Sequence, residues 1–288
     1  MFLILGLAVV FGSVVTGYLM HHGELAVLLQ YNEFVIIGGA GFGAILVGNK
    51  PSTVKGIFRE SIGLFRPNPY DRATFTELLQ VLYEVFYAAR KDGLVGIESH
   101  VENPQESELF KKYPSFHKNH HAVSFLSDTM KVLLTGAVDD HHLSEILDLD
   151  LEQHHHEALK VPQALQTVAD AMPGFGIVAA VLGIIITMGK IGGSPEAVGE
   201  SVAAALVGTF LGVLLAYGVL GPMANAVQAR VVSEERYLAT IRTALLSFSR
   251  GDPPITSVEF ARRNIEPETR PSFAELEELT RRRGRSDG

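Results

Sequence analysis

The sequence predicts an all-α integral membrane protein with four transmembrane helices and a helical cytoplasmic domain between the second and third of them. The leading observation is the stretch 201–229, which contains no Asp, Glu, Lys, Arg or His. That stretch exceeds the roughly 20 apolar residues that cross about 30 Å of hydrocarbon. Three other stretches carry few or no charges: Phe2–Met20, Val27–Val47 and Met172–Gly189. Only 19% of all residues are charged, which also favours a membrane protein.

These stretches divide the chain into four segments. Residues 1–48 contain helices 1 and 2, 49–170 form the cytoplasmic domain, 171–229 contain helices 3 and 4, and 230–288 form a cytoplasmic tail. The first stretch lacks a basic n-region and an A-x-A-like site, so we expect a retained helix rather than a signal peptide. Glu33 is expected at or beyond the end of the second span, which could begin as late as Phe34. Pro173 is expected to open the third span, in the first turn of its helix, and Pro222 to close the fourth span by ending or bending its helix.

Lys and Arg near the span ends predict the orientation. The connection after the first span has neither residue, and the one between the last two spans has only Lys190. By contrast, basic residues follow the second and fourth spans: Lys50, Lys55, Arg59, Arg66, Arg230, Arg236 and Arg242. The positive-inside rule therefore places both chain ends and the 49–170 domain in the cytoplasm.

The extramembrane segments read as helices. Apolar residues recur with helical spacing from Phe75 to Phe86, and Arg90 and Lys91 precede Gly93, as at an ordinary helix C-terminus. A second helix is expected over 123–137 and a third from near Asp139. In the tail, which reads as an appended element, the spacing of Ser272 and Glu275 predicts a capping box at the start of a helix over 272–283.

Several function classes are disfavoured. No spacing typical of a nucleophilic triad, a Walker motif or a metalloprotease is present, so we do not expect an enzyme or a cofactor. The histidines at 120–121, 141–142 and 154–156 include adjacent pairs, which point apart on a helix, so a solvated acidic and histidine-rich face is favoured over a metal site. The net charge of −8 disfavours nucleic acid.

The fourth span carries a stripe of small residues suited to close helix packing, formed by Ala204, Gly208, Gly212 and Ala216. Thr209 and Tyr217 add hydroxyl groups beside it. An ion path normally has an acidic side chain or His at membrane depth, and none is expected within these spans. If ions cross here, the carboxylate must come from another polypeptide, packed against the stripe.

Three strings resemble the A subunit of the bacterial flagellar stator, the MotA/PomA family. They are ADAMPGFGIVAAVLG at 169–183, VGTFLG at 207–212 and YGVLGP at 217–222. RKDG at 90–93 with Glu98, and RPSFAELEE at 270–278, extend the resemblance over nearly the whole chain. It implies a stator subunit of the inner membrane that forms a proton channel with a single-span MotB-like subunit and converts ion flow into torque. Further copies of the chain, membrane lipid and the rotor switch-complex protein would be its other partners.

The resemblance also implies residue roles. Pro173 and Pro222 match positions that couple ion passage to shape change, Thr209 matches a hydroxyl in the ion path, and Tyr217 lies two turns beyond it. Sodium-driven relatives carry Thr where this chain has Ala180, so H⁺ is expected rather than Na⁺. Arg90 and Glu98 match charges that meet the rotor.

Two alternatives stay open. An ExbB/TolQ-like energiser would also use proton flow with a single-span partner, to drive outer-membrane transport or maintain envelope integrity. Such proteins typically have three spans, the first preceded by a polar N-terminal segment that this sequence lacks. The Arg90 and Glu98 pair and the tail motif also favour the flagellar stator. A passive membrane scaffold would leave the hydroxyl groups and the paired prolines without a purpose.

Overall fold

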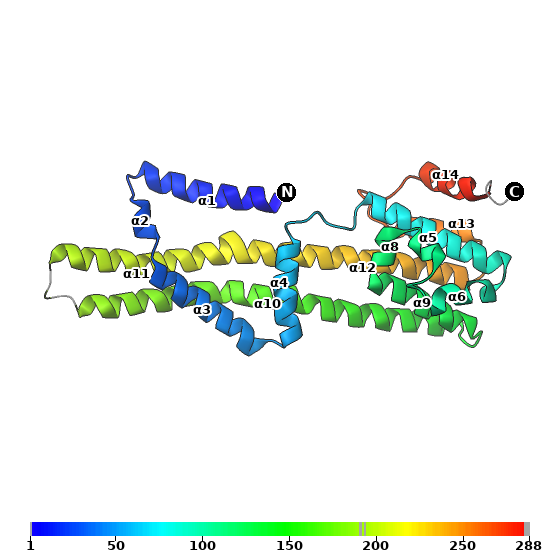
Figure 1. Cartoon of the computed structure of the whole chain (residues 1–288), viewed down its shortest axis with the longest axis horizontal. Helices are drawn as coiled ribbons and strands as arrows, with labels where there is room; N and C mark the ends of the chain where they lie inside the picture. The colour runs from blue at the N-terminus through cyan, green and yellow to red at the C-terminus, as the bar shows by residue number, and fades with distance from the viewer. Residues whose placement is uncertain (1, 190–191, 193, 285–288) are drawn as a thin grey trace. The chain divides into compact units, whose positions relative to one another are not determined.

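The computed structural model describes residues 2–189, 192 and 194–284, and it is helical, with no strand in that part of the chain. The chain forms two compact units (Figure 1). The membrane unit combines Met1–Pro67 with Ala158–Arg230, and the extramembrane unit combines Asn68–Glu157 with Val231–Gly288. The predicted segments 1–48 and 171–229 both fall in the membrane unit, whereas 49–170 is shared between the units.

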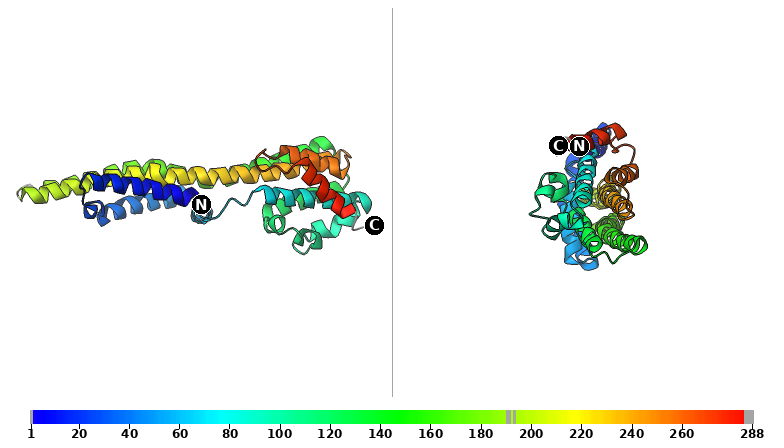
Figure 2. Two further views of the ribbon diagram at one scale, coloured as in Figure 1. Left: turned by 90° about the horizontal axis from the view of Figure 1, so that it is seen from above. Right: turned by 90° about the vertical axis from the view of Figure 1, so that its right-hand side faces the viewer.

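The membrane unit contains helices from both halves of the sequence. Its elements are α1 (Phe2–Met20), α2 (Leu25–Leu28), α3 (Tyr31–Gly48), α4 (Pro51–Gly63), the later part of α10 (Asp140–Met188), α11 (Pro195–Leu215), the π-helical turn η2 (Ala216–Leu220) and the start of α12 (Gly221–Ser249). Within the described residues, four helical stretches are long and apolar enough to cross a membrane, which confirms the predicted number. In this unit α10 and α11 lie side by side in both Figure 1 and Figure 2.

The extramembrane unit surrounds one apolar core. Its elements are α5 (Arg72–Lys91), η1 (Leu94–Ile97), α6 (Glu98–Glu102), α7 (Glu108–Lys111), α8 (Pro114–Lys118), α9 (His120–Leu134), the start of α10, the end of α12, α13 (Pro254–Asn264) and α14 (Phe273–Gly284). The predicted helix from Phe75 is α5. Asp71 caps it by accepting a hydrogen bond from the Thr74 amide, and Gly93 follows its end with φ of +74°.

The tail is part of this core, so the expectation of an appended element is wrong. Val258 and Ala261 of α13 and Leu276 of α14 are buried, and both helices pack on α5. The predicted capping box is present. The Ser272 amide donates to Glu275 Oε2 at 2.5 Å, and the Glu275 amide donates to Ser272 Oγ at 3.2 Å.

The two marked prolines do not end helices. Pro173 lies inside α10, as does Pro162, and Pro222 is the second residue of α12, directly after η2. The expectation that Pro173 lies in the first turn of a helix is therefore wrong, and Pro222 does not end its helix but follows a π-helical turn. A proline removes one amide donor and crowds the preceding turn, and a π-helical turn is one way to accommodate such a change within a continuous helix. Lys190, on which part of the predicted orientation rests, lies outside the described residues.

Candidate functional site

The centre of the candidate site is a contact between the backbones of α10 and α11. A Cβ atom added to Gly212 would lie 2.7 Å from the Met172 carbonyl oxygen and 2.9 Å from Gly176 Cα. A Cβ added to Gly176 would lie 2.8 Å from the Gly208 carbonyl oxygen. Real side chains do not tolerate such distances to backbone atoms, so both positions require glycine.

The small-residue stripe is therefore used within the chain. Gly208 faces Ala179 and Ala180 of α10, at 3.1 Å and 3.3 Å from an added Cβ, and Gly183 of α10 meets Ala205 in the same way. Ala216 is buried and Ala204 is half-buried. We expected the stripe to receive a partner carrying the ion-binding carboxylate. That expectation is wrong for Gly208 and Gly212, because α10 of the same chain already covers them.

Two of the expected pathway residues lie at this contact. Thr209 and Ala180 are half-buried. Thr209 Cα would lie 3.3 Å from a Cβ added to Gly176, and the Ala180 amide nitrogen would lie 3.3 Å from a Cβ added to Gly208. Tyr217 instead projects from η2 with 70% of its surface exposed, and Pro222 is also exposed. Pro173 is half-buried in α10, one residue after Met172, whose carbonyl oxygen faces Gly212. Ala180 and Thr209 therefore both lie at the α10 and α11 contact, whereas Tyr217 lies on the surface of the chain.

Glu33 belongs to this site and was not expected there. It lies in the first turn of α3 within the candidate span Leu25–Gly48, so its placement at or beyond the span end is wrong. Its side chain is 5% exposed, and Oε2 would lie 2.5 Å from a Cβ on Gly208. The sequence could have indicated that Glu33 faces inward, because it shares a spacing of four with Ile37, Gly41 and Ile45. All four residues are buried in α3.

The charged pair expected at the rotor lies in the extramembrane unit. Arg90 is in the last turn of α5, and its guanidinium donates hydrogen bonds to the carbonyl oxygens of Gly251 and Asp252, the latter at 3.1 Å. Glu98 begins α6 and is exposed. Its side chain makes no hydrogen bond or ion pair within the described part of the chain. Arg90 thus holds the turn after α12, whereas Glu98 has no evident structural role.

The histidine clusters pair with carboxylates. His155 Nδ1 lies 3.0 Å from Glu235, His142 Nδ1 lies 3.0 Å from Asp139, and the His154 side chain, 19% exposed, lies 3.6 Å from Glu234. The expectation of a fully solvated face is wrong for His154, which links α10 to α12. Across the described ranges, no three His, Cys, Asp or Glu side chains are placed to hold a metal ion.

Two family models match the sequence. Residues 4–93 match the motility protein A N-terminal model, and residues 117–240 match the model of the MotA/TolQ/ExbB proton channel family. The second match includes the α10 and α11 segments that form the glycine contact and carry Thr209.

Curated relatives and solved structures agree with these matches. Motility protein A of Escherichia coli is 37% identical over 98% of this chain and 95% of its own length, and chemotaxis protein LafT of Vibrio parahaemolyticus is 33% identical over 95% and 96%. The solved C. jejuni MotAB structure shares the fold with a TM-score of 0.74 at 21% identity, covering 94% of this chain and 98% of that one. The structure of the flagellar MotAB stator complex from Bacillus subtilis has a TM-score of 0.70 at 19% sequence identity, covering 89% of this chain and 92% of that one. The chain therefore belongs to the motility protein A family, within the MotA/TolQ/ExbB proton channel family.

Proposed function

We propose that this chain is the A subunit of a bacterial flagellar stator, and that with a single-span B subunit it forms a proton channel that drives rotation of the motor. The observation that carries the proposal is the 37% identity to a motility protein A over nearly the full length of both chains. The α10 and α11 contact, with Thr209 beside it, supports a role for these helices in the channel.

The surface of the membrane unit supports partners in the bilayer. Large apolar side chains of α10 and its neighbours are exposed, among them Ile177, Val181, Ile184, Ile185 and Tyr217. In hydrocarbon such side chains face lipid or the helices of other chains. We assign them to lipid, to further copies of this chain and to the single-span subunit, which would supply the carboxylate that carries the proton.

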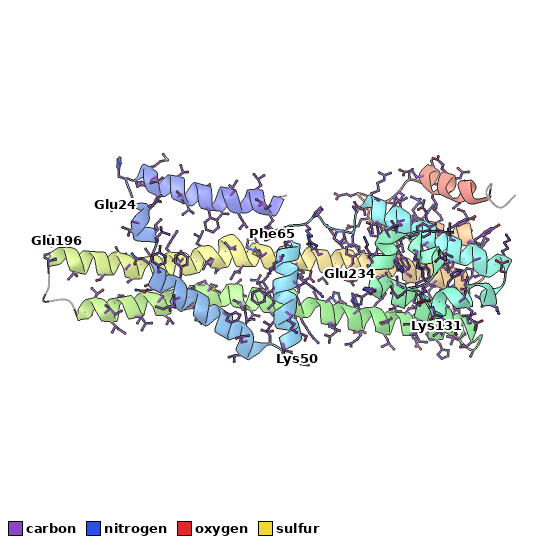
Figure 3. The ribbon with its side chains drawn as sticks, in the orientation of Figure 1. Glu24, Lys50, Phe65, Lys131, Glu196 and Glu234 are labelled. Carbon is purple, nitrogen blue, oxygen red and sulfur yellow. The ribbon has the colours of Figure 1, made fainter. Side chains whose placement is uncertain are left out.

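Charge at the ends of the membrane unit supports the orientation. Figure 3 shows Glu24 and Glu196 toward one end of this unit and Lys50 toward the other. We place the Lys50 end, both chain ends and the extramembrane unit on the cytoplasmic side of the inner membrane, because basic residues concentrate on that side.

Within the channel we assign an ion-path role to the Thr209 hydroxyl group and to Tyr217, and a coupling role to Pro173 and Pro222. The side chain of Ala180 is a methyl group, which cannot ligate a dehydrated sodium ion, where sodium-driven relatives carry a Thr hydroxyl group. The coupled ion is therefore H⁺.

Swimming of complemented cells tests this function. The chain and its own single-span partner are produced in a host that lacks both stator subunits. We expect swimming that persists without sodium and stops when the proton gradient is collapsed. Thr209→Ala should slow it, whereas the control Thr187→Ala should not, because the Thr187 hydroxyl already donates to the Gly183 carbonyl oxygen at 2.8 Å. Swimming that needs sodium would overturn the ion assignment.

For the rotor contact we assign Arg90 and Glu98, whose exposed charges suit a contact that is made and broken rapidly. Glu98→Lys is the sharper test of the two, because Arg90 also holds the carbonyl groups of Gly251 and Asp252. Glu98→Lys should reduce swimming while membrane insertion and protein level stay normal. Normal swimming of that variant would remove Glu98 from the rotor contact.

An ExbB/TolQ-like function is disfavoured. The proton channel model covers all three kinds of protein, but residues 4–93 match the model specific to motility protein A, and the curated relatives named above are motility and chemotaxis proteins.

A further inference from the structure

We infer that the carboxyl group of Glu33 is a second proton-exchange site of the channel, on this chain itself, which takes up and releases the transported proton beside Gly208. The inference rests on the proposed function. It differs from it in placing a protonatable group in the A subunit, in addition to the carboxylate of the single-span subunit.

The first support is the surroundings of the carboxyl group. Glu33 is 5% exposed, and its Oε2 atom is buried without a hydrogen-bond partner. Across the described parts of the elements near it, α2, α3, α10 and α11, no cationic side chain forms an ion pair with it. An ionised carboxylate is costly in such a place, so burial favours the protonated, neutral form of the group.

The second support is its position on the buried face of α3. The neighbours on that face, Ile37 and Ile45, are apolar and pack into the core of the membrane unit. A residue needed there only for packing would be apolar too, because it would avoid the cost of an unpaired polar group. A carboxyl group is therefore explained better by chemistry than by packing.

The third support is the direct contact of the carboxyl group with α11, one of the two helices to which we assign a role in the channel. Oε2 lies against Gly208, whose other neighbours are Ala179 and the Ala180 amide of α10, and Thr209 is the next residue of α11. A side chain at position 208 would displace the carboxyl group, so the same glycine brings α10, α11 and Glu33 together. Release of the proton leaves a carboxylate and uptake restores the neutral acid. The proton passes to or from water or the partner's carboxylate, and no other bond changes.

The test compares Glu33→Gln with Glu24→Gln, a matched control at an exposed glutamate in the connection between α1 and α2. Gln keeps the size and polarity of Glu but cannot exchange a proton. In the complementation host, Glu33→Gln should lower swimming speed by at least about tenfold, a modest loss for a positioned proton-transfer group. Its protein level and co-purification with the single-span subunit should stay normal, and Glu24→Gln should swim like the native chain.

Infrared difference spectra of the purified complex give a readout independent of swimming. The native complex should show a carbonyl band of a protonated carboxyl group that is missing from Glu33→Gln. If Glu33→Gln does not accumulate, Glu33→Asp replaces it and should shift the band and slow swimming. Native speed and an unchanged band in the variant that accumulates would overturn the inference. Failure of the native pair to support swimming would count against the proposed function instead.

Discussion

The two units of the molecule are packed by different means. In the extramembrane unit, large side chains fill one core: Leu78, Phe86 and Tyr237 are fully buried, and the Phe86 and Phe248 rings stack with their centroids 4.4 Å apart. In the membrane unit, α10 and α11 approach so closely that backbone meets backbone at Gly176 and Gly212. No residue in the apolar stretch of α1, Leu3–Met20, is buried.

This difference follows from the two solvents. In water, burial of apolar side chains drives folding, so a domain closes around them. In hydrocarbon an exposed Leu costs nothing, and helices associate through close van der Waals contact, for which glycine is suited. The extramembrane unit can thus complete its own core, whereas the membrane unit keeps apolar surface for lipid and other chains.

The largest effect should come from breaking the extramembrane core. Phe86→Ala removes a buried ring and leaves a cavity, which should cost about 3–5 kcal/mol of unfolding free energy. Phe260→Ala is the control, because that ring is 52% exposed, and it should change stability by less than about 0.5 kcal/mol. Thermal unfolding of the full chain in detergent measures both. Similar midpoints for the two variants would contradict a side-chain core.

A smaller effect should come from adding one methyl group to the membrane unit. Gly176→Ala forces α10 and α11 apart, because its Cβ would meet the Gly208 carbonyl oxygen, and should cost about 1–3 kcal/mol. Gly174→Ala in the same helix adds a methyl group with no atom within 4 Å beyond its chain neighbours and the adjoining backbone of its own helix. Protein level and thermal midpoint should fall only for the first. An equal loss for Gly174→Ala would reveal another chain packed at that position.

The smallest effect concerns the tail and depends on pH. The Ser272 amide and hydroxyl, with Arg72, lower the pKa of Glu275 from 4.5 to about 2. Since the folded pKa is below the unfolded value, Glu275 stabilises the fold above pH 4.5, and this contribution is lost as the pH falls toward 2. The gap in midpoint between native chain and Glu275→Gln should close over that range. A gap independent of pH would show that Glu275 acts through packing alone.

Much of the fold could be predicted, because long apolar stretches and local caps depend on few residues. The four spans, the helix ending at Lys91 and the Ser272 capping box are local features, and the structure confirms them. The positions of Pro173 and Pro222 relative to the helix ends were harder to predict, because a proline can be accommodated inside a helix that packing with other helices stabilises. The packing of the tail could not be predicted, because Val258 and Leu276 are buried in a core formed with α5, which is far away in the sequence.

The site was harder to predict for the same reason. Thr209 and Ala180 came from a motif, and the structure places both at the α10 and α11 contact. The glycine stripe was recognised, but its spacing could not reveal that α10 of the same chain covers it. Glu33 was expected at or beyond the end of the second span, because the position of one acidic residue cannot be judged until its neighbours on other helices are known.

The π-helical turn η2 changes how positions along this helix are counted. Each α-helical residue advances by about 100°, so one extra residue in a turn rotates everything after it by that amount. The buried Ala224 beyond η2 falls on the same spacing of four as Ala204, Gly208, Gly212 and Ala216. In a straight α-helix it would lie about 80° around from Ala216, and the extra residue of η2 returns it to nearly the same side. A helical wheel drawn straight through 195–249 would assign the residues after η2 to the wrong face. Deleting one residue within 216–220 would change which side chains of α12 face inward while leaving its composition almost unaltered.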